Sequence, residues 1–259
     1  MRTVLYYLLT VLLAITLGYF LMNMRPKSIP KVITVDTEYS FLMGDDERGS
    51  FVIYINEKHH DLTKISHYDR LYIYDNHDES KIELSLLTVA LGHEEMYLSE
   101  RFYRIIITFK LPFSNHDFSF KDAYIGIDLN SQAHYDFRLG KVYFMKPSND
   151  SVRCDYETLE GRKKIDALLS RLHYIYLTSF ESDHTLLSIY LNPDREVMFT
   201  YEQGLLVITI PDDLYLLYNT PIRLHFIDGS IYHIPNFNYM MDYIILKESG
   251  PLINSYDVR

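Results

Sequence analysis

Hydrophobic residues form one long uncharged run at the start of the chain, over residues 3–22 (TVLYYLLTVLLAITLGYFLM). An α-helix rises about 1.5 Å per residue, so a helix over this run would cover roughly 30 Å, the thickness of a bilayer's hydrocarbon core. The rest of the chain contains no comparable run. We therefore predict a transmembrane helix in residues 1–24, followed by a stalk over residues 25–31, where Pro26 and Pro30 stop the helix.

After residue 31, apolar and polar residues often alternate with the period of two that is typical of β-strands. In residues 81–86 (KIELSL), for example, the two kinds of side chain would lie on opposite faces of a strand. Turn-forming clusters such as residues 75–78 and 114–117 separate these segments. Strands are expected over residues 31–35, 50–55, 70–74, 81–91, 101–111, 123–129, 135–145, 174–177, 185–191, 196–201, 204–210 and 243–247. Short strands at this spacing predict a mainly β fold with an antiparallel, sandwich-like body.

One segment, residues 161–172, has the period of a helix instead. Four apolar residues at positions i, i+3, i+4 and i+7 form a single stripe there: Ile165, Leu168, Leu169 and Leu172. We expect this helix to connect two β-modules. The predicted domains are a sandwich-like module over residues 32–148, and the helix with a second β-module over residues 149–259.

The clearest hairpin covers residues 223–234 and turns at Asp228-Gly229. This pair fits a two-residue type I′ turn, whose positive φ angles suit the twist of the strands. In that register Leu224 and Phe226 share a face with Ile231 and His233.

The N-terminal helix is either a permanent anchor or a cleaved signal peptide. A signal peptide has an apolar core of about 7–15 residues followed by small residues at the cleavage site. Here the run is longer and ends in bulky residues, so we expect an uncleaved, single-pass signal-anchor in the cell membrane. Arg25, Lys27 and Lys31 outnumber Arg2, which favours a cytoplasmic body by the positive-inside rule. A two-residue head before an apolar helix is instead typical of a signal-anchor, and we expect the body outside the cytoplasm.

Charge and composition exclude some partners. The 259 residues include 25 Lys and Arg against 35 Asp and Glu, a formal net charge of −10. Nucleic acid is bound chiefly by Lys and Arg, so it is not an expected partner. Tyrosine is abundant, with 24 residues against 14 Phe and no Trp. An aromatic surface for carbohydrate or peptide is one interpretation, but the tyrosines are spread along strand-like segments, which favours a role in sheet faces.

The usual signatures of catalysis are missing from the sequence. The glycines include no G-x-G pair, which excludes the common dinucleotide and kinase loops, and Ser50 stands where a P-loop between Gly44 and Gly49 would need lysine. No serine lies in a G-x-S-x-G motif. The single cysteine, Cys154, can form no intramolecular disulfide and is expected to be an incidental thiol. The balance favours a protein that is not an enzyme, and no cofactor is expected.

A metal site is the sharpest chemical alternative. Histidine and aspartate are common zinc ligands, and the densest group of them is His59, His60, His67 and Asp69. On a regular strand His59 and His60 would point to opposite faces, whereas a loop allows both to reach one ion. The more common interpretation is that these are surface histidines in polar loops.

Together these features predict a membrane-anchored, non-catalytic interaction protein, an accessory or assembly subunit of a cell-envelope complex. Its sheet faces and edges would bind a protein partner. One alternative is a metal- or ligand-responsive extracytoplasmic sensor domain. Another is a membrane-tethered surface hydrolase, which would need a serine, a histidine and an acid to converge in a pocket.

Overall fold

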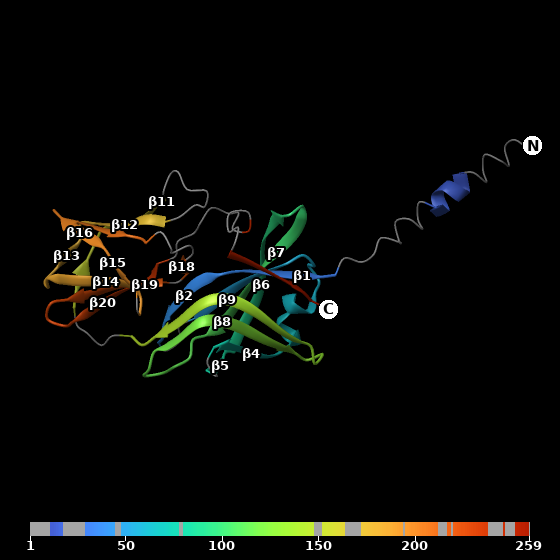
Figure 1. The fold of residues 1–259 in the computed structure, drawn as a ribbon, viewed down its shortest axis with the longest axis horizontal. Coiled ribbons are helices and arrows are strands. Elements are labelled where there is room, and N and C mark those ends of the chain that lie inside the picture. The colour runs from blue at the N-terminus through green and yellow to red at the C-terminus, as the bar shows by residue number, and fades with distance from the viewer. Residues whose placement is uncertain are drawn as a thin grey trace, which may run out of the picture.

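The computed structural model describes residues 11–17, 29–44, 48–77, 80–147, 152–163, 172–193, 195–211, 217–218, 220–237, 246 and 252–258. Residues 11–17 are helical, and their apolar side chains are exposed (Figure 1). Within the described part of the chain, none of the helices has both the length and the hydrophobicity needed to cross a bilayer. Residues 3–10 and 18–22 of the expected span lie outside the described residues, so the anchor remains a prediction.

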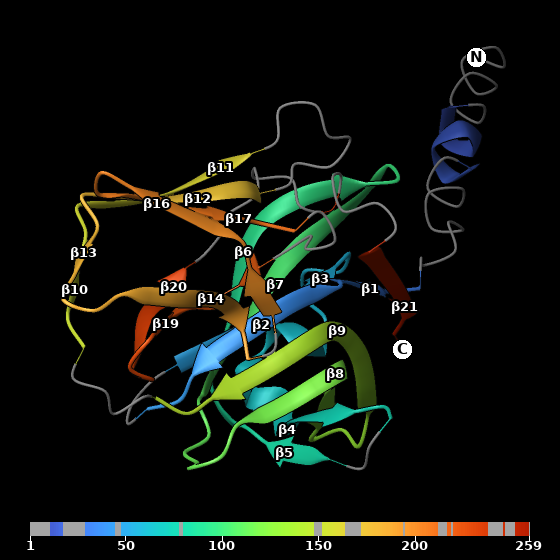
Figure 2. The ribbon, with the colours of Figure 1, turned by 60° about the vertical axis from the view of Figure 1, so that its left-hand side comes forward.

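The described body consists of strands in mainly antiparallel sheets, which confirms the predicted class (Figures 1 and 2). In spatial order, the five-stranded sheet contains β21 (Ile253–Asp257), β1 (Lys31–Val35), β3 (Arg48–Ile55), β7 (Glu100–Lys110) and β6 (Ser85–Tyr97). The six-stranded sheet contains β18 (Leu217–Tyr218), β2 (Thr37–Leu42), β9 (His134–Met145), β8 (Phe118–Leu129), β4 (Tyr68–Asp75) and β5 (Lys81–Glu83). Two 3₁₀ turns, η1 (Asp61–Thr63) and η2 (Ile65–His67), precede β4.

Two further four-stranded sheets follow along the chain. The β12 sheet has the order β11 (Thr158–Lys163), β12 (Leu172–Thr178), β17 (Leu205–Thr209) and β16 (Phe199–Glu202). The β14 sheet has the order β15 (Arg195–Val197), β14 (Leu186–Asn192), β19 (Thr220–Phe226) and β20 (Ile231–Phe237). A short ladder joins β10 (Cys154–Asp155) to β13 (Glu181–Ser182).

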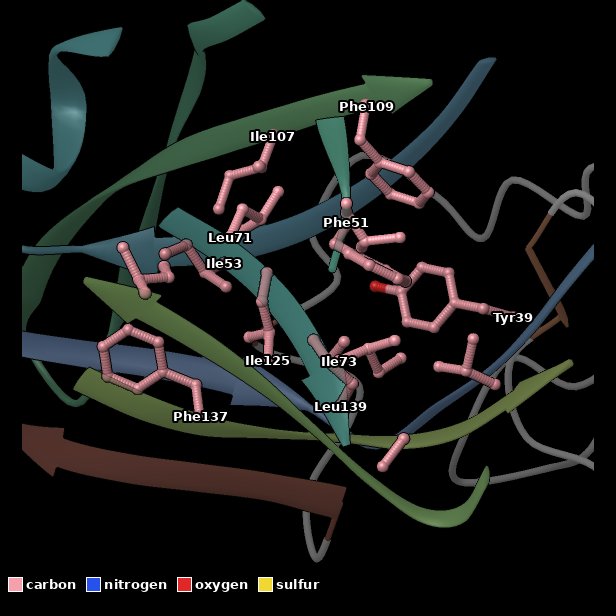
Figure 3. Close-up of a cluster of buried hydrophobic side chains, with 14 of the residues drawn as sticks. Tyr39, Phe51, Ile53, Leu71, Ile73, Ile107, Phe109, Ile125, Phe137 and Leu139 are labelled. Carbon is pink, nitrogen blue, oxygen red and sulfur yellow. The ribbon is translucent and has the colours of Figure 1, made fainter. Parts of the chain in front are cut away.

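The first hydrophobic core lies between the five-stranded and six-stranded sheets. Inward-facing residues of both sheets meet there because side chains alternate along each strand (Figure 3). The cluster includes Phe51 and Ile107 from one sheet and Ile73, Ile125 and Phe137 from the other. The C-terminal strand β21 pairs with β1, so the end of the chain returns to this body.

The chain passes between these sheets from β1 to β2, and β2 runs parallel to β9. The parallel pairing begins at Thr37 opposite Gly140, which has φ +104°. A Cβ atom at residue 140 would lie 2.6 Å from the carbonyl oxygen of Thr37. Both the conformation and the close approach therefore require glycine there.

A second core lies between the β12 and β14 sheets. It includes Ile175 and Ile208 from the first and Ile189, Leu224 and Phe226 from the second. These buried residues lie within 154–234, whereas the first core draws on residues 32–144 and Val258. The predicted domain boundaries themselves remain predictions.

The prediction of a helix over residues 161–172 is wrong at both ends of this segment, where the structure has strands. Residues 161–163 complete β11, and Leu172 begins β12, the antiparallel neighbour of β11. Leu172, Ile175 and Leu177 are buried in the second core, and pairing in a sheet overrides the helical spacing. Residues 164–171 lie outside the described residues, as does the strand expected over residues 243–247 apart from buried Leu246.

The hairpin of β19 and β20 is confirmed, but the predicted register is wrong by one residue. The turn has three residues rather than two, because Phe226 N–H donates to the Ser230 carbonyl and Gly229 takes φ +86°. Leu224 therefore lies opposite Tyr232, and His233 lies opposite Arg223. A shift of one residue moves each side chain to the other face, so His233 does not share the apolar face with Leu224.

Candidate functional site

The outer face of the six-stranded sheet carries a dense group of aromatic and charged side chains. Over residues 71–73 of β4, 123–129 of β8 and 137–139 of β9, the residues with odd numbers, such as Ile73, Ile125 and Phe137, point into the first core. Alternation places their neighbours on the opposite face. We call the following set the tyrosine–histidine face: Tyr72, Tyr74, Tyr124, Asp128, His134, Asp136 and Arg138. Register aligns Tyr74, Tyr124 and Arg138 in one row across the three strands.

Gly126 determines how Tyr72 lies on this face. Tyr72 is opposite Gly126, and a Cβ atom at residue 126 would come within 2.2 Å of the Tyr72 ring. The tyrosine ring therefore occupies the space that a side chain at residue 126 would fill, directly over the backbone of β8. The plane of the His134 ring is within 13° of the Tyr72 plane, so these two rings are nearly parallel.

The aromatic rings continue from one strand to the next. Ring centroids are 6.3 Å apart for His134 and Tyr72, 6.0 Å for Tyr72 and Tyr74, and 5.6 Å for Tyr74 and Tyr124. The ammonium group of Lys81 lies 3.3 Å from the centre of the Tyr72 ring, which leaves Tyr72 only 8% exposed. The Lys81 residue is itself exposed, so its side chain can move away from the ring.

His134 lies between two carboxylates. Its Nδ1 atom is 2.7 Å from Asp128 Oδ1, and its Nε2 atom is 2.7 Å from Asp136 Oδ2. Hydrogen bonding to Asp128, followed by Asp136, raises the pKa of His134 above its ordinary value of 6.5. The other oxygen of Asp136, Oδ1, is buried, and burial, followed by the charge of Asp136, raises the pKa of Tyr74. An imidazolium that donates from both nitrogens has no lone pair with which to act as a general base.

Arg138 ends the row with two acids of its own. Its Nε atom donates to Asp122 Oδ1 at 2.6 Å, and its Nη1 atom donates to Asp36. Asn254 of β21 donates to the second oxygen of Asp36 at 2.8 Å. Hydrogen bonding to Asp122 is the main cause that raises the pKa of Arg138. This charge network is paired, and it fixes the edge of the aromatic row.

A second exposed surface is the free side of β6, the edge strand of the five-stranded sheet. No strand among the described residues pairs with that side. Thirteen residues long, β6 exposes Leu87, Leu91 and Met96. Unpaired backbone groups beside exposed apolar side chains can accept an added strand from another chain.

The residues of the predicted metal site are not arranged as ligands of one ion. His60 Nδ1 accepts the Leu62 N–H at 3.2 Å, and His67 Nδ1 is 3.0 Å from Asp61 Oδ1. Burial lowers the pKa of His60. Asp69 lies next to Arg70, 3.9 Å away, and His59 is an exposed turn residue. Across the described residues, no three His, Cys, Asp or Glu side chains are placed to hold a metal ion.

Cys154 is buried in the second core, and burial raises the pKa of its thiol. Such a thiol is a poor nucleophile at neutral pH. The sequence argument missed the tyrosine–histidine face, although the alternation in residues 71–74 (LYIY) and 134–138 (HYDFR) was a usable signal for two of its three strands.

No family model and no curated protein sequence matches this chain. Among solved structures it is similar to SGBP-B of the Bacteroides ovatus mixed-linkage glucan utilization locus, a structure in complex with a mixed-linkage heptasaccharide. The identity is 13%, over 80% of this chain and 43% of that chain, with a TM-score of 0.22. The chain thus spans less than half the length of that protein, and a similarity this weak supports no conclusion about function.

Proposed function

We propose that the protein is a non-catalytic binding protein of the cell envelope, held at the membrane by its N-terminal segment, and that the tyrosine–histidine face binds a neutral saccharide chain. The observation that supports this proposal is the row of four rings, from His134 to Tyr124, with the carboxylates of Asp128 and Asp136 beside it.

The chemistry of the face matches that of a sugar. A pyranose ring has apolar C–H faces and a rim of hydroxyl groups, so it packs on an aromatic face and donates to acceptors at the edge. Tyr72 lies over Gly126 with His134 nearly parallel to it, and a sugar that packs on the Tyr72 ring displaces the exposed Lys81 side chain that covers it. Asp128 and Asp136, whose side chains are 32% and 36% exposed, supply carboxylate acceptors at the edge. The formal net charge of −10 disfavours an acidic saccharide.

The test compares two glycine variants of the full chain in detergent. Gly126→Ala pushes the Tyr72 ring off the sheet, whereas Gly92→Ala leaves room, since the nearest atom is 3.4 Å from the new Cβ. Affinity gels that contain neutral polysaccharides are expected to retard the parent and Gly92→Ala, and to retard Gly126→Ala at least about tenfold less strongly. Tyr124→Ala is a second variant, which weakens the row without crowding the sheet.

Two results would contradict this proposal. One is a parent protein that no neutral polysaccharide retards. The other is equal retardation of the parent, Gly126→Ala and Tyr124→Ala when circular dichroism shows that all three are folded.

A protein partner that adds a strand to β6 is a second candidate, favoured by the exposed Leu87, Leu91 and Met96. A photo-crosslinking residue at Leu91 is expected to capture one protein in the native membrane. The control places the photo-crosslinking residue at Ile227, which is exposed in the turn between β19 and β20, and this variant should capture no protein. Identical products from both positions would remove this candidate.

A further inference from the structure

The β14 sheet has its own polar face, turned away from the second core. Ile222, Leu224 and Phe226 point into that core, so Arg223 and His225 lie on the opposite side of β19. Tyr190 of β14 pairs with Arg223 in the ladder, and its ring lies 4.7 Å from the His225 ring. The nitrogen donors of Arg223 and His225, two positions apart on β19, therefore share one surface.

Arg223 is a half-buried cation that pairs with no anion among the described residues. Its Nε atom is buried and makes no hydrogen bond to any described residue, and no described carboxylate lies within 4.0 Å of the guanidinium. Its polar contact is Nη1 to the Met145 sulfur, at 3.9 Å. Burial lowers the pKa of Arg223. Arg138, by contrast, bonds two carboxylates.

His225 presents a second unused donor. Its Nε2 atom is buried and has no hydrogen-bond partner among the described residues. Burial, followed by the charge of Arg223, lowers the pKa of His225, so the ring is neutral at neutral pH. A neutral imidazole whose proton is on Nε2 donates one N–H from this position, and the tautomer is an assignment of ours.

Two acids lie near enough to act on these groups. Asp117 acts on Arg223 from the side of Met145, and its Oδ1 accepts the Lys146 N–H at 2.8 Å. Glu196 acts on His225 and accepts the Tyr190 hydroxyl at 3.3 Å. Neither forms an ion pair with Arg223 or His225, so within the described part of the chain these donors stay unpaired. The two acids also limit how tightly an anion can bind.

A buried charge or donor without a partner costs folding free energy. Such a group therefore calls for an explanation, and a missing ligand is one that fits the donor chemistry. The guanidinium presents N–H groups in a planar fork that matches the oxygens of an oxyanion. An imidazole N–H from a different direction suits a tetrahedral anion better than a planar carboxylate.

We propose that Arg223 and His225 form a binding site for a phosphate-type oxyanion, at the junction between β19 and the end of β9. Figure 2 shows β14 and β19 beside the six-stranded sheet, and the contact of Arg223 with Met145 joins β19 to the end of β9. The site is separate from the tyrosine–histidine face, which belongs to another sheet.

The test measures thermal unfolding of the full chain in detergent, in phosphate-free buffer and with inorganic phosphate at constant ionic strength. Phosphate is expected to raise the melting temperature of the parent and of Arg153→Met, whose arginine side chain is 81% exposed. Arg223→Met should lose the effect, with an affinity at least about tenfold weaker. Without phosphate, Arg223→Met should be no less stable than the parent, because it removes an unpaired charge.

His225→Gln keeps the assay informative if Arg223→Met fails to fold, and it should weaken the phosphate effect. Glycerol phosphate in place of inorganic phosphate distinguishes a site for a phosphate carried on a larger molecule from one for the free ion. The proposal is overturned if neither phosphate shifts the parent, or if both variants respond as the parent does.

Discussion

The stability of the protein should fall as the pH rises above 6.5, because of His134. Its ring nitrogens lie 2.7 Å from Asp128 and 2.7 Å from Asp136, and these carboxylates raise its pKa above 6.5. Because the folded state binds the proton more tightly than the unfolded state, the stabilisation is fully present below pH 6.5. It is lost as the pH rises through the folded pKa.

The exposure of the His134 side chain determines how much its two ion pairs stabilise the protein. The His134 side chain is 47% exposed, so solvent screens both pairs. Exposed ion pairs contribute about 0.2–1 kcal/mol each, and two of them give about 1 kcal/mol in total at low salt. His134→Gln, which carries no titrating group, should therefore lose about 1 kcal/mol at acidic pH and close to nothing at alkaline pH. Salt at about 1 M should reduce the acidic difference.

Urea unfolding of the parent and His134→Gln at several pH values measures this difference directly. His60→Gln is the matched control because burial lowers the pKa of His60, which gives the opposite sign. The buried neutral ring resists protonation, so His60 costs stability as the pH falls below 6.5. If the parent and His134→Gln have parallel stability profiles across the range, the pairing of His134 with the two carboxylates is refuted.

Two further predictions concern packing. The first tests a contact between the part of the protein that surrounds the first core and the part that surrounds the second, and the other tests the first core itself. Asn192→Ala removes an amide that donates to Glu38 Oε2 at 2.6 Å and accepts from Ser40 Oγ at 2.6 Å. The change should cost about 1–3 kcal/mol in urea unfolding, because Ser40 stays buried without its partner while Glu38 keeps its ion pair with Lys141. An unchanged midpoint would show that this contact does not join the bodies. Phe144→Ala removes a fully buried ring and should cost about 3–5 kcal/mol. Phe113→Ala, at a residue 75% exposed, should stay within about 0.5 kcal/mol of the parent, and equal losses in the two variants would contradict the assigned core.

Local pattern was enough to predict many strands of this protein, although it missed β2 and β21. The alternation that places Ile125 and Phe137 in the first core can be seen in the sequence, because the period of two belongs to each strand alone. The same local argument failed at residues 161–172. A stripe with helical spacing was available there, but the pairing of β11 with β12 depends on partners distant in sequence.

Register was the other property that the sequence did not determine. The Asp228-Gly229 pair fits a two-residue turn, yet the structure has a three-residue turn that ends at Gly229. One added residue moved His233 from the expected apolar face to the side of Arg223. Local contacts also decide where the residues of the predicted metal site lie, and whether they bind a metal stays a prediction. His60 and His67 are close in sequence, but His60 Nδ1 accepts the Leu62 N–H and His67 Nδ1 lies 3.0 Å from Asp61 Oδ1.

Arg138 and Arg223 show why strand pairing decides the chemistry of a sheet surface. Both arginines lie on strands between buried apolar neighbours, so local pattern gives them the same role. Pairing places Arg138 among Asp36 and Asp122, which neutralise it and make it part of a fixed edge. Pairing places Arg223 opposite Tyr190 and His233, without an ion pair to any described residue. Arg138 is therefore structural, whereas Arg223 keeps N–H donors that are available to a ligand. For this reason Arg138→Met should destabilise the fold, and Arg223→Met should not.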